Sequence, residues 1–108
     1  MIRHIVMWKF RPGCEAEAEE FLERLRGLGD QLEMIRAMRV ERDSSGKADH
    51  FDAVLIADFD HEQALAAYLS DPRHLAVSAL CKSIREQRAS VDYVWEPNRE
   101  ADGSPNQF

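Results

Sequence analysis

Two segments of this sequence, residues 2–10 and 51–59, have the β-branched and aromatic composition of strands, and both are apolar on both faces. Successive side chains of a strand point to opposite sides of a sheet, so helices packed on one side can bury only half of these residues. An antiparallel sheet whose second side met water would alternate apolar and polar residues more cleanly. A second layer must therefore cover the other face, whose residues are Ile5, Met7, Val54 and Ile56.

Three further elements follow from periodicity and composition. Apolar residues at steps of three and four predict a helix over residues 14–35. Residues 35–43 and 89–95 have the composition of strands, and the polar residues 44–50 predict a loop after the second strand.

The region after the third strand predicts a helix that is interrupted once. Asp60, with Gln63 three residues later, has the spacing of a capping box. Asp71, followed by Pro72, is predicted to cap a second helical piece that runs to about Gln87. The order is therefore β-α-β-β-α-β. This is the ferredoxin-like pattern of the α+β class, with an antiparallel sheet and both helices on one face.

A chain of 108 residues is one domain's worth, and no segment is left over to cover the second face of the sheet. Residues 1–96 are predicted to form the domain, and the polar residues 97–108 a flexible tail. A second copy of the chain is the economical cover, because two-fold dimers are the commonest symmetric assembly. The sequence thus predicts a homodimer whose sheets pack face to face as a dimeric α+β barrel.

Charge and hydropathy narrow the range of partners. The net charge of −6 argues against nucleic acid, whose phosphates need a basic patch, and against an anionic membrane surface. No apolar run reaches the ~18 residues of a membrane span. The opening MIRHIVMWKF lacks the features of a signal peptide. We therefore expect a cytoplasmic protein in which Cys14 and Cys81 are reduced thiols.

The segments MIRHIVMWKF, FDAVLIADFDHEQALAAYLSDPRHLAV and ASVDYVW resemble the stress-responsive A/B barrel (Dabb) family over residues 1–95. The resemblance implies a ferredoxin-like fold and a homodimeric α+β barrel. Many members have no assigned reaction. A distantly similar member, olivetolic acid cyclase, closes a polyketide chain by aldol condensation in a pocket between sheet and helices. The resemblance implies that His4, Tyr68 and His74 match its working groups, whereas Leu25 replaces a further tyrosine and removes a polar group.

Each of these three residues has a second interpretation. His4 shares its strand face with apolar residues, so it is either a base in an apolar pocket or a core histidine held by a backbone carbonyl. His74 is either a neutral base at the positive end of a helix or a surface residue of its first turn. The hydroxyl of Tyr68 either meets a ligand or bonds a carbonyl. The predicted wall of the pocket consists of Val6, Trp8, Phe21 and Leu25.

The sequence shows no signature of a metal or cofactor site. The four histidines lack HxxxH or HExxH spacing, and no glycine-rich phosphate loop follows a strand, so we predict neither a metal nor a cofactor. The loop carboxylates Asp43, Asp49 and Asp52 could hold a hard cation weakly, as could most acidic loops. His50 and His61 are expected to be solvated.

Three functions remain open. The first is a domain that binds a small apolar or aromatic molecule between sheet and helices. The second is a cofactor-independent enzyme, like a polyketide cyclase or an oxygenase, with His4 and His74 as acid and base. The third is a non-catalytic stress-responsive structural protein. A pocket that both imidazoles reach would favour the first two, and a filled core the third.

Overall fold

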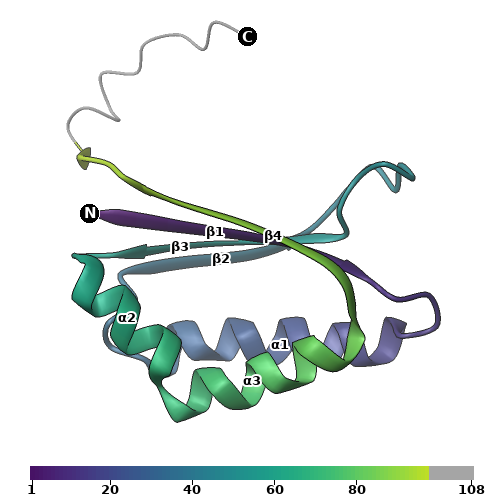
Figure 1. Ribbon diagram of the computed structural model, residues 1–108, viewed down its shortest axis with the longest axis horizontal. Helices are drawn as coiled ribbons and strands as arrows, with labels where there is room; N and C mark the ends of the chain where they lie inside the picture. The colour runs from purple at the N-terminus through teal and green to yellow at the C-terminus, as the bar shows by residue number, and fades with distance from the viewer. Residues whose placement is uncertain (98–108) are drawn as a thin grey trace, which may run out of the picture.

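The computed structural model of this protein describes residues 1–97 as a four-stranded sheet with helices on one side (Figure 1). The strand order is β2-β3-β1-β4, and each neighbouring pair is antiparallel. The predicted ferredoxin-like order is confirmed, with the second helix in two pieces. Of the tail predicted at 97–108, all but Pro97 lies outside the described residues. The elements are β1 Ile2–Phe10, α1 Glu15–Gln31, β2 Ala37–Arg42, β3 Ala53–Phe59, α2 Glu62–Ser70, α3 Pro72–Ile84 and β4 Arg85–Val94.

The central strand β1 carries the residues on which the core is built. Its alternation turns Ile2, His4, Val6 and Trp8 toward the helices, and all four are buried. The apolar stripe of α1 packs against this face, where Trp8 and Phe21 meet edge to face with ring centroids 5.0 Å apart. Full burial of one large apolar side chain contributes roughly 1.5–3 kcal/mol, so this face supplies much of the stability of the fold. His4 is therefore held inside the apolar core.

Helix α1 is shorter than its hydrophobic spacing predicts. The helix ends at Gln31 rather than at residue 35, because Leu32 takes an extended conformation as its C-cap. Leu32 and Ile35 are nevertheless buried, so the spacing reported burial correctly and backbone conformation incorrectly. The strands β2 and β3 each begin two residues later than predicted. Within residues 1–97, no helix combines the length and the apolar character needed to cross a membrane.

The boundary between α3 and β4 also differs from the prediction. Helix α3 ends at Ile84 rather than near Gln87, and β4 begins at Arg85 rather than at residue 89. The residues between are good helix formers, but β4 pairs with β1 as far as Phe10 opposite Arg85. Pairing with a neighbouring strand thus overrides the local preference for helix.

The chain turns sharply between α2 and α3 because one residue ends the first helix and begins the second. Asp71 is the C-cap of α2 and the N-cap of α3, and its carboxylate accepts a hydrogen bond of 2.8 Å from the backbone N–H of Arg73. The predicted cap at Asp71 is confirmed. The predicted cap at Asp60 is wrong, because the Nδ1 atom of His61 accepts from Ala64 N at 3.1 Å instead.

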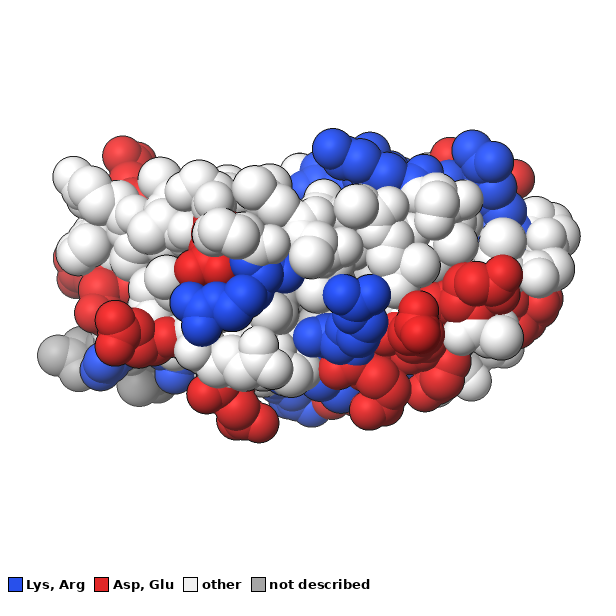
Figure 2. All heavy atoms as spheres, turned by 90° about the horizontal axis from the view of Figure 1, so that it is seen from below, with Lys and Arg blue, Asp and Glu red and all other residues white. Residues whose placement is uncertain are grey.

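The face of the sheet opposite the helices is left uncovered by the described chain (Figure 1). It presents the predicted apolar residues, of which Met7 is 38% exposed, together with Val91 at 55% and Tyr93 at 39% on β4. By contrast, the outer side of the helices mixes acidic, basic and uncharged side chains, as Figure 2 shows. The helical side is thus suited to water, and the apolar strip of the sheet is suited to a further protein layer.

Candidate functional site

A cavity of about 60 Å³ lies between the sheet and the helices. It is lined from β1, β3, β4 and all three helices, and it is open to solvent on one side. Every residue that the sequence analysis placed in a site lines this one cavity, namely His4, Val6, Trp8, Phe21, Leu25, Tyr68 and His74. We call this cavity the histidine pocket.

His4 enters the pocket from β1 with a carboxylate behind it. The residue is only 5% exposed, and its Nδ1 atom lies 2.5 Å from Oδ1 of Asp92, which is its direct partner on β4. A carboxylate can only accept, so a neutral His4 ring carries its proton on Nδ1 and leaves Nε2 unprotonated. The alternative interpretation, a core histidine held by a backbone carbonyl, is therefore wrong about the partner, which is the carboxylate of Asp92.

His74 enters from the opposite side, as the third residue of α3. Its Nδ1 lies 3.2 Å from the backbone carbonyl oxygen of Leu69, which also only accepts, so here too Nδ1 carries the proton. Burial lowers the pKa of His74; the hydrogen bond to the carbonyl of Leu69 opposes this shift, and the positive charge of Arg88 adds to it. The ring is therefore neutral at pH 7, with the lone pair of Nε2 available.

Tyr68, from α2, lies between the two imidazoles. Its ring centroid is 6.3 Å from that of His4 and 4.4 Å from that of His74. The two imidazole centroids are therefore closer than the ~12 Å beyond which one small molecule could not reach both. The residue is fully buried, and its hydroxyl has no hydrogen-bond partner among the described residues. Burial raises the pKa of Tyr68, so the hydroxyl keeps its proton and remains a donor.

The rest of the wall is apolar or neutral. Trp8, Phe21 and Leu25 are each almost completely buried. Burial raises the pKa of the Cys81 thiol, which therefore lines the pocket as an uncharged group and not as a thiolate nucleophile. In such surroundings a hydrogen bond is stronger than in water, because little solvent competes for it.

Sequence reasoning missed the polar residues that β4 contributes. Asp92 holds His4, and Arg85 and Arg88 line the pocket. Asp92 lies within the predicted strand 89–95, where a single charged residue indicates only a face that meets solvent, and Arg85 and Arg88 precede that strand. The missing information is the register, which sets Asp92 opposite His4 and Arg88 opposite Trp8. The one available signal for a functional residue was Asp92, a charged residue within the otherwise uncharged stretch VDYV.

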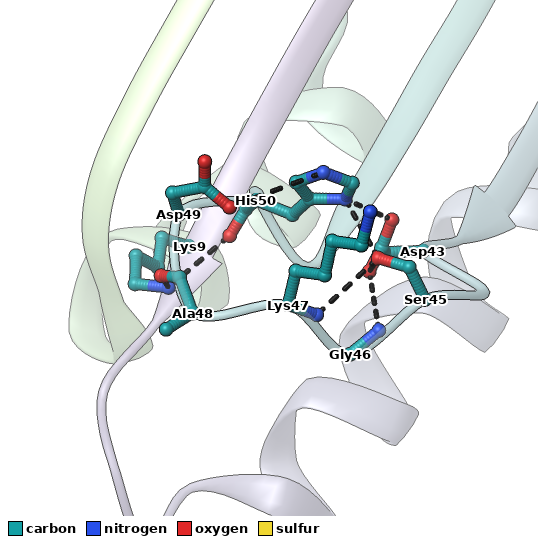
Figure 3. Close-up of polar contacts among 8 residues, drawn as sticks. All are labelled: Lys9, Asp43, Ser45, Gly46, Lys47, Ala48, Asp49 and His50. Carbon is teal, nitrogen blue, oxygen red and sulfur yellow. Dashed lines mark hydrogen bonds and ion pairs between the residues drawn. The ribbon is translucent and has the colours of Figure 1, made fainter.

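The acidic loop considered for a cation forms a network of its own hydrogen bonds (Figure 3). Nδ1 of His50 lies 3.0 Å from Oδ1 of Asp43 and 2.7 Å from the hydroxyl of Ser45. These contacts hold the side chain of His50 in place although the residue is exposed. Hydrogen bonds from His50 and from the Gly46 N–H lower the pKa of Asp43 to about 2. The carboxylate of Asp52 instead accepts from Phe10 N at 2.8 Å. Across residues 1–97, no cluster of three or more histidine, cysteine or acidic residues is arranged to hold a metal ion.

Comparison with known proteins agrees with this architecture. The chain is 32% identical over 83 residues to the uncharacterized protein SCO4036 of Streptomyces coelicolor, covering 74% of this chain and 86% of that protein. A solved structure of a dimeric ferredoxin-like protein of unknown function from Bacteroides fragilis is 24% identical and superposes with a TM-score of 0.78, covering 87% of this chain and 95% of that chain.

Two further structures share the fold. A dimeric ferredoxin-like protein of unknown function from Thermobifida fusca is 23% identical, covers 87% of this chain and 90% of that chain, and has a TM-score of 0.78. The hydroxynitrile lyase of Passiflora edulis is 14% identical and also has a TM-score of 0.78. The match covers 89% of this chain and 94% of that chain. The family model of the Stress responsive A/B Barrel Domain (Dabb) matches residues 2–95. The chain therefore belongs to the stress responsive A/B barrel domain family.

Proposed function

We propose that this protein binds a small, largely apolar molecule with a carbonyl group in the histidine pocket. The observation that carries the proposal is the Tyr68 hydroxyl, a fully buried donor without a partner among the described residues, beside two imidazoles. A buried polar group left unpaired costs roughly 1–3 kcal/mol, and a ligand carbonyl would recover that cost by accepting the hydrogen bond. A purely structural role gives no reason for an open cavity lined by these groups.

The size of the cavity limits the ligand. At about 60 Å³ it is smaller than the ~150 Å³ engineered cavity that holds benzene, so it fits a molecule of a few non-hydrogen atoms. An aromatic ligand would need the wall to move, and Leu69, which lines the pocket and is 38% exposed, is the side chain most free to do so.

Binding can be tested with 2-butanone as the probe. In ¹H–¹⁵N NMR titrations, we expect shifts of the Trp8 indole and of the backbone amides of residues 68–78, and weaker binding by Tyr68→Phe. His50→Gln, in the loop of Figure 3, is the matched control and should bind as the wild type does. Shifts spread over the whole surface, or equal binding by Tyr68→Phe, would contradict the proposal.

A second function, cofactor-independent proton transfer, is favoured by the positions of the imidazole protons. Both rings have their Nδ1 atoms committed to acceptors, Asp92 and the carbonyl of Leu69, so Nε2 is the free basic atom of each. Nε2 of His74 would take a proton from the carbon next to the carbonyl. The C–H electron pair would become the enolate, whose oxygen would accept a hydrogen bond from Tyr68. Return of the proton from the imidazolium to carbon would complete the cycle. A lyase on the same fold, the Passiflora edulis protein, supports catalysis as a possible use of this pocket.

Exchange of the ketone's α-protons in D₂O, followed by ¹H NMR, separates binding from catalysis. We expect the wild type to accelerate exchange of 2-butanone, and His74→Gln to lose about 100-fold or more of this acceleration while His50→Gln keeps it. Binding without any acceleration would leave the first proposal standing and overturn the second.

We further propose that two copies pack through the uncovered face of the sheet as a homodimer. Similar solved structures are described as dimeric, and the apolar strip of this face has no cover among the described residues. The histidine pocket lies on the other side of the sheet, so dimerisation leaves it accessible.

A further inference from the structure

Two arginines of β4 lie at the histidine pocket and take no part in the function proposed above. Arg85 and Arg88 both line the cavity. Arg88 is set opposite Trp8 by the register of β4 on β1, which turns its side chain to the same side of the sheet as His4. Arg88 is an exposed residue, so its side chain lies where the lining of the pocket meets solvent.

Neither arginine has a carboxylate partner among the described residues. The Arg88 guanidinium donates a hydrogen bond of 3.3 Å to the hydroxyl of Ser90, and Arg85 lines the pocket together with the Cys81 thiol. Six other arginines are paired with carboxylates, as Arg73 is with Asp71 at 3.0 Å, whereas Arg11 and Arg24 form no ion pair among the described residues. The chain carries 20 acidic against 14 basic residues, so carboxylates are not scarce. No acidic residue lines the pocket, so among the described residues its lining carries two guanidinium groups without a carboxylate.

We infer that the ligand of the histidine pocket is a short keto-acid anion, whose carboxylate is bound by Arg88 and whose carbonyl lies between Tyr68 and His74. This inference rests on the proposed function and names its ligand class. A guanidinium presents two parallel N–H donors that match the two oxygens of a carboxylate. The apolar end of the anion would lie against the buried wall. Asp92 keeps its negative charge while it accepts from His4, but it is not among the residues that line the pocket.

Pyruvate and pyruvamide are the matched probes, because they have nearly the same shape and differ in the charge of one group. We expect the wild type to bind pyruvate roughly 10- to 100-fold more tightly than pyruvamide in NMR titrations, as a hydrogen bond to a charged group allows. Arg88→Gln should lose this preference while its affinity for pyruvamide stays unchanged. Arg24→Gln, on α1 and outside the pocket lining, is the control and should keep the preference.

The possible results are distinguishable. Equal binding of the two probes by the wild type overturns the inference and leaves the proposed function intact. A preference for pyruvate that survives in a folded Arg88→Gln overturns the assignment to Arg88. Failure of the wild type to bind pyruvate, pyruvamide and 2-butanone overturns the proposed function itself. Because the first comparison uses only the wild type, it tests the ligand class even if Arg88→Gln fails to fold.

Discussion

Removal of the Tyr68 hydroxyl should stabilise the ligand-free protein while it weakens ligand binding. The side chain is fully buried, and its oxygen has no hydrogen-bond partner among the described residues. An unsatisfied buried hydroxyl costs roughly 1–3 kcal/mol, and Tyr68→Phe keeps the ring contacts with His4 and His74. The small void left by the oxygen offsets part of the gain. We therefore expect the free energy of unfolding to rise by about 1 kcal/mol.

Thermal unfolding followed by circular dichroism measures this change. For a domain of this size, about 1 kcal/mol corresponds to a rise in Tm of roughly 4–8 °C. Wild type and variant must be compared at one protein concentration, because the stability of a dimer depends on it. Tyr93→Phe is the comparison, since its hydroxyl already accepts a hydrogen bond from Arg3 at 3.4 Å, and its removal should not raise Tm. A loss of more than about 1 kcal/mol in Tyr68→Phe would refute the reasoning, because it would show that the hydroxyl already has a partner.

Two further predictions concern the dimer and the response to pH. Met7→Glu places a charge in the proposed interface and should give a particle of protomer mass, 12.4 kDa, in light scattering; a particle of unchanged dimer mass would contradict the interface. The pKa of His74 is lowered in the folded state, so below pH ~6.5 the unfolded chain binds a proton that the folded chain does not. Stability should therefore fall as the pH decreases from ~6.5 and level off below the folded pKa, and His74→Gln should flatten this slope in urea unfolding at several pH values.

The order of the elements could be predicted from the sequence because it depends on local signals. Their β-branched and aromatic composition identified β1 and β3, and Asp71 with Pro72 marked the turn between α2 and α3. Helix ends could not be placed as well, because apolar spacing reports which side chains are buried. Leu32 is buried whether or not its backbone is helical.

The apolar part of the site was predictable for the same reason, whereas its charged part was not. His4 stood out as a polar ring on an apolar strand face, whereas Tyr68 and His74 were assigned through the resemblance to the Dabb family. Asp92 looked like an ordinary solvated strand residue, and Arg88 lay before the predicted strand 89–95. Only the pairing of β4 with β1 sets Asp92 beside His4 and Arg88 at the pocket. Strand register between segments about 80 residues apart is a tertiary property that no local pattern encodes.

The proposed chemistry depends most on the protonation of the two imidazoles, which we infer to carry a proton on Nδ1 and to present an unprotonated Nε2 to the pocket. Long-range ¹H–¹⁵N correlation spectra of the ¹⁵N-labelled protein report the protonation of each ring nitrogen. At pH 8, where free imidazole is neutral, we predict protonated Nδ1 and unprotonated Nε2 in His4 and His74, with the His74 Nε2 signal shifting when pyruvate is added. If His74 instead carries its proton on Nε2, it cannot act as the proposed base, and the proposed proton transfer in the histidine pocket is contradicted.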